Sequence, residues 1–179
     1  MDRKLSLAAD ELFLAALAEG KDVRLHVDGT SMVPILKPGD VVVVRRVAPH
    51  SLNKGDMVIV HREHDLVTHR LVRQKEGQWL TKGDNSRYFD PPAAAEMILG
   101  KVIAIERKDT GIDLQEASKR SLNRWLASLS CLEADVFRLG HQLRGASRNS
   151  AVDRAGMQGS LAARLVSFPF RLAIRMLVR

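Results

Sequence analysis

The segment from Gly29 to Pro34 places a serine where it could act as a nucleophile. Ser31 lies between a glycine-containing turn and the apolar residues Met32 and Val33. A serine held in this way at the end of a strand exposes its hydroxyl, and neighbouring backbone N–H groups can face an oxyanion that develops during acyl transfer. Taken alone, the segment is better explained by a serine that forms a turn or a cap. A catalytic role therefore requires partner residues elsewhere.

Partners of the required types follow further along the chain. His69 lies in an apolar run, and an imidazole with a pKa near neutrality is a suitable base for a serine hydroxyl. Asp84, in the run Thr-Lys-Gly-Asp-Asn of residues 81–85, and Asp90 are both candidates for the acid that orients the imidazole. Each residue also has a simpler interpretation. A lone histidine on a strand is usually a core or surface residue, and Gly-Asp-Asn is a good turn.

Short β-branched runs separated by turn residues predict a mainly β domain that would position these side chains. Pro-Gly-Asp at 38–40 and Lys-Gly-Asp at 54–56 each precede a valine-rich run, as turn residues before a strand should. The expected strands are residues 23–27, 41–47, 57–61, 66–72, 78–80 and 98–105.

Helical patterns flank the β-rich region. Residues 5–18 have apolar residues at helical spacing and end near Gly20, a good C-cap, and residues 114–139 form a second amphipathic stretch. Residues 140–159, rich in Gly, Ser, Arg and Asn, are typical of a linker. We therefore predict an N-terminal helix in residues 1–22, a β catalytic domain in 23–110, and a basic helical extension in 111–179 with its linker near 140–159. Trp79 and Trp125 are expected in the core.

The last twenty residues form an apolar segment with regularly spaced arginines. At about 100° per residue, a helix would collect these arginines on one side. Pro169 should kink or divide such a helix, and the arginine content argues against a membrane span. Two interpretations stay open for residues 160–179: peripheral contact with an anionic membrane surface, and packing against the core or a partner. The arginines are Arg164, Arg171, Arg175 and Arg179.

Composition limits the function classes. A chain of 179 residues with 45% hydrophobic residues can form one domain with an extension. The single cysteine, Cys131, excludes an intrachain disulfide, and we expect neither a metal site nor a cofactor. Residues 111–179 hold 11 Lys and Arg against 5 Asp and Glu, so an anionic partner should be sought there. Only 4% of residues are aromatic, so we do not expect nucleic-acid binding.

The order and spacing of these motifs resemble the signal peptidase I superfamily. The closer resemblance is to its endoplasmic-reticulum, archaeal and sporulation-type branch, in which a histidine replaces the catalytic lysine. It spans residues 24 to 106. The residues that carry it are Gly29-Thr-Ser31-Met-x-Pro34, Pro38-Gly-Asp40, Lys54-Gly-Asp56-x-Val58, His69-Arg70, Thr81-Lys-Gly-Asp84-Asn85, Asp90 and Leu99-Gly-Lys-Val102.

The resemblance implies a serine endopeptidase with a signal-peptidase-like or SOS-repressor-like β fold. Ser31 would be the nucleophile and His69 the base, with Asp90 ranked ahead of Asp84 as the supporting acid. The chain departs from the family at Gly29, where no hydroxyl is present, so an oxyanion hole would rely on backbone N–H groups such as that of Ser31. Residues 111–179 have no counterpart in the family pattern.

A peptide or preprotein is the expected substrate, bound as an added strand. The first residues contain neither a signal peptide nor a membrane anchor. We therefore expect a cytoplasmic location. Under the first of the two interpretations given above, residues 160–179 would contact the inner membrane surface. One alternative is a non-catalytic, peptidase-like scaffold whose basic C-terminal helix binds a membrane or another anionic partner. Another is a self-cleaving repressor, but that family uses lysine as base and carries an N-terminal DNA-binding domain, for which about 20 residues are too few.

Overall fold

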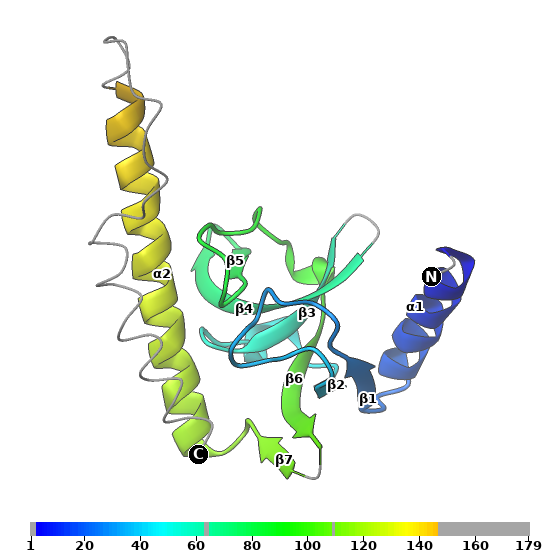
Figure 1. The fold of residues 1–179 in the computed structure, drawn as a ribbon. Helices are drawn as coiled ribbons and strands as arrows, with labels where there is room; N and C mark the ends of the chain where they lie inside the picture. The colour runs from blue at the N-terminus through cyan, green and yellow to red at the C-terminus, as the bar shows by residue number, and fades with distance from the viewer. Residues whose placement is uncertain (1–2, 63–64, 109, 147–179) are drawn as a thin grey trace.

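A computed structural model of the chain describes residues 3–62, 65–108 and 110–146. Seven strands form one antiparallel sheet in the order β1-β2-β6-β3-β4-β5, and β7 pairs with β6 (Figure 1). The strands are β1 (Val23–His26), β2 (Val41–Arg45), β3 (Met57–Arg62), β4 (Asp65–Lys75), β5 (Gln78–Lys82), β6 (Ile98–Arg107) and β7 (Thr110–Asp113). The prediction of a mainly β fold with an N-terminal and a C-terminal helix is confirmed.

The sheet differs from the prediction at one strand. β7 was not expected, because Gly111 and Asp113 are poor strand formers. It exists because it pairs with β6, with Ile112 opposite Ile105. Pairing with a long neighbouring strand therefore overrides local propensity here.

Both faces of the central strand β3 are buried. Met57 and Ile59 pack into the larger core with residues of β2 and β6, whereas Val58 and Val60 pack into a second core with Leu71 and other residues. Side chains of a strand alternate between its two faces, so one strand joins both cores. The sheet edge that carries β4 and β5 is thereby held rigidly against the rest of the domain.

Two helices lie at opposite ends of the sheet (Figure 1). Helix α1 (Arg3–Ala18) contacts β1 and β6 and contributes Phe13 and Leu17 to the larger core. Helix α2 (Ala117–Ala146) runs along β4 and adds Leu126 to the same core. Two short 3-10 turns, Pro49–Ser51 and Ala95–Met97, complete the regular structure of the described residues.

Helix α2 corrects two expectations. It continues to Ala146, so the linker predicted for 140–159 is wrong at its beginning. Trp79 is buried as expected, but the prediction for Trp125 is wrong, because this side chain is 48% exposed on the side of α2 that faces away from the sheet. The remainder of the linker and the segment 160–179 lie outside the described residues, and the division into three parts stays a prediction.

Candidate active site

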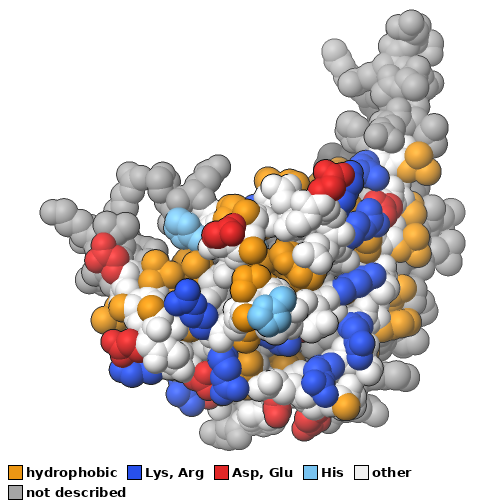
Figure 2. Space-filling model, turned by 180° about the vertical axis from the view of Figure 1, so that it is seen from behind, with side chains coloured by type: hydrophobic (Ala, Val, Ile, Leu, Met, Phe, Trp, Pro, Cys, Tyr) orange, Lys and Arg blue, Asp and Glu red, His pale blue; other side chains and the backbone are white. Residues whose placement is uncertain are grey.

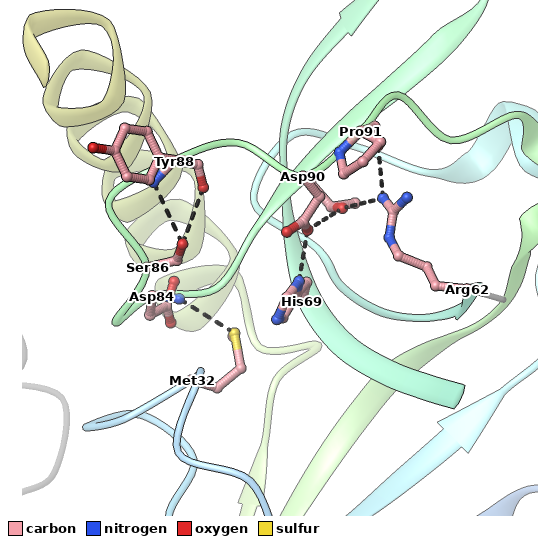
Figure 3. Close-up of polar contacts among 9 residues, drawn as sticks. Met32, Arg62, His69, Asp84, Ser86, Tyr88, Asp90 and Pro91 are labelled. Atoms are coloured by element: carbon pink, nitrogen blue, oxygen red, sulfur yellow. Dashed lines mark hydrogen bonds and ion pairs between the residues drawn. The ribbon is translucent and has the colours of Figure 1, made fainter. Parts of the chain in front are cut away.

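His69 and Asp90 form a close pair at the edge of the sheet. His69 lies on β4 opposite Val58 of β3, and its Nδ1 is 2.6 Å from Oδ2 of Asp90 (Figure 3). The two side chains are 11% and 15% exposed. An ionised carboxylate can only accept a hydrogen bond, so Nδ1 carries the proton and the lone pair of a neutral imidazole lies on Nε2. This tautomer is the one a general base requires.

Backbone pairing to β5 fixes the position of Asp90. Its N–H donates to the carbonyl of Thr81 over 2.9 Å. Three residues further on, Ala93 and Trp79 exchange two backbone hydrogen bonds of 2.8 Å. After the loop that follows β5, the chain therefore runs back along β5 like a short additional strand. This pairing places the Asp90 carboxylate beside His69.

Two further side chains hold the Asp90 carboxylate in place. The hydroxyl of Thr81 donates to the same Oδ2 over 2.6 Å. Arg62 in turn donates to that hydroxyl over 3.0 Å and to the carbonyl of Pro91 over 2.8 Å. Burial by itself would raise the pKa of Asp90, but the hydrogen bonds from His69 and Thr81 and the nearby positive charge of Arg62 outweigh it and lower this pKa below its usual 3.8. Asp90 is thus an anion at neutral pH.

Ser31 is presented by the irregular segment between β1 and β2. Its neighbours Met32 and Leu36 are buried in the larger core and anchor the segment, while Ser31 itself is half-buried. The N–H of Asn85 donates to the carbonyl of Ser31 over 2.7 Å. The loop that follows β5 therefore attaches directly to the residue that the sequence singled out as a nucleophile.

Ser31 and His69 meet at Gly83. A Cβ atom at position 83 would lie 3.1 Å from Nε2 of His69, 3.2 Å from Cβ of Ser31 and 2.7 Å from the Ser31 carbonyl oxygen. Only a glycine therefore fits between the two side chains without displacement. Nε2 is buried and accepts no hydrogen bond within the described part of the chain. The lone pair of the candidate base is thus unused by the described residues and lies on the same side of Gly83 as Ser31. A hydrogen bond between a nucleophile and its base commonly shortens only when substrate binds.

Asp84, the other candidate acid, has a different environment. It forms a two-pronged ion pair of 2.8 and 2.7 Å with Arg70, and both side chains are fully buried. Arg70 also donates to the carbonyl of Gly55 and to Oδ1 of Asn123 on α2, each over 2.9 Å. Figure 3 shows Asp84 beside Met32 and apart from the His69–Asp90 pair. The geometry assigns Asp84 to the interior and Asp90 to the histidine.

Sequence reasoning missed three residues that support the site. Thr81 lies in a run that the resemblance had marked, so its contact with Asp90 had a signal in the sequence. No sequence signal marked Arg62 or Asn123, because the partner of each lies far away along the chain, 19 residues for Arg62 and 53 residues for Asn123. Within the described ranges, no group of three or more His, Cys, Asp or Glu side chains is arranged to hold a metal ion.

Comparison with known proteins agrees with this architecture. The family model described as Peptidase S24-like matches residues 3–103, which is more than half of the chain. No curated protein matches the chain. The match confirms the resemblance at the level of the superfamily that contains the LexA-type and signal-peptidase-like domains, and the Ser/His branch stays a prediction. With its sheet, its helices and a match of this length, the chain belongs to the Peptidase S24-like family, which includes serine peptidases and LexA-type repressors.

Proposed function

We propose that the protein is a serine endopeptidase in which Ser31 attacks the substrate, His69 acts as base and Asp90 orients His69. The observation that carries the proposal is the 2.6 Å contact between His69 Nδ1 and Asp90. Within the described residues it leaves Nε2 without a hydrogen-bond partner, and both Nε2 and Ser31 lie against Gly83. The proximity of Ser31, His69 and Asp90, which come from three separate segments, supports these three roles.

The reaction follows from this arrangement. Nε2 of His69 takes the proton of the Ser31 hydroxyl as Oγ bonds to the carbonyl carbon of the scissile peptide. The oxyanion would be stabilised by the backbone N–H of Ser31, as expected from the sequence. The neighbouring N–H groups of Val33 and Asn85 already donate to the carbonyls of Thr30 and Ser31. His69 then gives the proton to the leaving amine, the peptide C–N bond breaks, and an acyl ester on Ser31 remains. Water, deprotonated by His69, hydrolyses the ester and restores the hydroxyl.

The environment of Lys82 supports histidine rather than lysine as the base. Lys82 adjoins Gly83, but its side chain is fully buried and turns toward α2. Its Nζ donates to Oγ of Ser130 over 2.9 Å and lies 3.1 Å from Glu133. A lysine whose ammonium group makes these contacts cannot also accept the proton of Ser31. This favours the Ser/His branch of the superfamily over the lysine-dependent repressors.

The substrate class proposed is a peptide or preprotein. A strand-like substrate would receive backbone hydrogen bonds from the segments that flank the site.

None of the helices in the described ranges has both the length and the apolar character needed to span a bilayer. Separately from that finding, we keep the sequence-based expectation of a cytoplasmic location as part of the proposal, with a substrate that reaches the enzyme there.

Active-site acylation tests the proposal. Wild type, Ser31→Ala and His69→Ala are incubated with a panel of serine acylators, including a β-lactam, and their intact masses are followed over time. We expect one adduct on wild type, none on Ser31→Ala and an acylation rate on His69→Ala that is lower by about 10²-fold or more.

Circular dichroism on all three proteins shows whether each is folded. An adduct that persists in Ser31→Ala would remove Ser31 from the mechanism. A folded wild type that reacts with none of the acylators, with or without lipid, would favour the non-catalytic scaffold instead.

A further inference from the structure

Large apolar side chains form an exposed row on α2. The row consists of Trp125, Leu132, Val136 and Leu139, which are 48%, 55%, 40% and 57% exposed. Their offsets of seven, four and three residues return to one side of an α-helix at about 100° per residue. We call these four residues the outward face of α2.

The opposite side of the helix is firmly packed. Leu126, Ala127, Ser130 and Ala134 are almost fully buried against the sheet. Polar contacts from Arg70 to Asn123 and from Lys82 to Ser130 hold the helix in this rotation. The outward face therefore cannot turn inward to bury its apolar residues without breaking these contacts.

Basic residues lie at the flank of the outward face. At 100° per residue, Arg124 is about 100° and Arg120 about 140° around the helix from Trp125. The sequence of α2 contains five Lys and Arg but only two acidic residues, Glu133 and Asp135. Both carboxylates are already engaged, Glu133 by Lys82 and Asp135 by Arg73 and Arg138. Figure 2 shows Lys and Arg side chains in a row beside hydrophobic ones along the edge of the molecule where α2 lies. Arg120 and Arg124 are exposed, and neither forms an ion pair within the described residues, although Glu116 lies one helical turn before Arg120.

We infer that the outward face of α2 is a docking surface for an anionic lipid bilayer. Tryptophan and leucine side chains suit the boundary between head groups and acyl chains, and flanking arginines can reach the phosphates. A second copy of the chain would satisfy the apolar residues but would bring two cationic helices together in a protein of net charge +7. An anionic bilayer would both bury the apolar side chains and attract the positive charge. This inference is independent of the chemistry proposed for Ser31.

The two tryptophans of the chain allow a direct test. Trp79 is buried in a core, so Trp79→Phe in the full chain leaves Trp125 as the only fluorescent indole. This protein is mixed with vesicles of phosphatidylcholine alone or with added phosphatidylglycerol. We expect the emission of Trp125 to shift to shorter wavelength, and to be quenched by lipids brominated on the acyl chain, only when phosphatidylglycerol is present.

A matched pair of variants locates the contact. In a co-sedimentation assay with the anionic vesicles, Leu132→Ser/Leu139→Ser should weaken binding by on the order of tenfold or more. Leu12→Ser is the control, since Leu12 is 74% exposed but lies on α1. It should bind as wild type does.

Three results would overturn the inference. The outward-face variant could bind anionic vesicles as tightly as wild type, which would place any lipid contact elsewhere, for example in residues 160–179. Trp125 could already emit at short wavelength without lipid, so that another part of the chain covers it. Analytical ultracentrifugation could show a dimer that the same two substitutions dissociate, which would assign the face to a second copy.

Discussion

Two aspartates six residues apart illustrate how environment divides roles at the residue scale. Asp84 is fully buried and neutralises Arg70, whereas Asp90 remains 15% exposed and contacts His69. Both are carboxylates next to turns, so their types alone do not distinguish them. The difference arises because Asp84 still lies in the turn that ends β5, while Asp90 lies where the chain returns along that strand.

Asparagine substitutions should separate these roles. In Asp90→Asn, the side-chain amide can donate to Nδ1 of His69, which favours the tautomer with its proton on Nε2. The acylation rate should then fall by about 10²- to 10⁴-fold with little loss of stability. In Asp84→Asn, the buried Arg70 loses its counterion, and the free energy of unfolding should fall by about 3–5 kcal/mol.

Acylation kinetics and urea denaturation of both variants measure the two effects. Equal loss of acylation in the two folded variants would contradict the assignment of Asp90 to His69. A strong loss of stability confined to Asp90→Asn would contradict it as well.

At the scale of elements, an ion pair holds the segment that contains Ser31 against the sheet. Arg107 on β6 donates to both carboxylate oxygens of Asp40 over 2.7 and 2.6 Å and to the carbonyl of Ile35 over 2.8 Å. Asp40 also accepts the N–H of Lys37 over 2.8 Å. The irregular segment that presents Ser31 thus has a fixed end, although it contains no regular secondary structure.

This ion pair predicts a loss of stability in acid. Burial tends to raise the pKa of Asp40, but the hydrogen bonds from Arg107 and from the Lys37 N–H dominate and lower it below 3.8. The folded state therefore binds this proton more weakly than the unfolded chain. The resulting stabilisation is present above about pH 4 and is lost as the pH falls through the lowered pKa of the folded state.

Urea denaturation of wild type and Asp40→Asn between pH 2 and 6 measures this contribution. We expect the variant to be less stable at pH 6 by about 1–3 kcal/mol and to show a shallower dependence on pH below 4. Equal slopes for the two proteins would show that Asp40 does not contribute.

At the scale of the whole molecule, α2 is joined to the candidate active site although it lies beyond the matched family segment. Asn123 contacts Arg70, Ser130 contacts Lys82, and Asp135 contacts Arg73. A Cβ on Gly55 would meet the backbone of Asn123 and Arg124 at 2.7 Å, so the helix packs closely on this turn. Arg70, which follows His69, and Lys82, which precedes Gly83, are therefore held in place by a helix that lies outside the matched family segment.

The Asn123 contact predicts a measurable contribution of α2 to stability. Asn123→Ala removes one acceptor from the buried Arg70 and should cost about 1–3 kcal/mol, which lowers Tm by several degrees in a chain of this size. Ser128→Ala is the control, because Ser128 is exposed on the same helix and should change stability by less than about 0.5 kcal/mol. Calorimetry on both variants tests this. Equal Tm values would mean that the helix is not coupled to Arg70.

The sequence by itself determined the β-rich class, the end helices and the residues around which a site could form. These follow from local signals: alternating β-branched runs, Gly-Asp turns, and a serine, a histidine and two aspartates in a recognisable order. Only the tertiary structure decided that Asp90 rather than Asp84 meets His69, that Gly83 lies between Ser31 and His69, that Trp125 is exposed, and that α2 braces Arg70 and Lys82. Those outcomes depend on contacts between residues far apart in the chain. The burial of a side chain and the choice of its partner arise from packing, so the spacing of residues along the chain does not predict them.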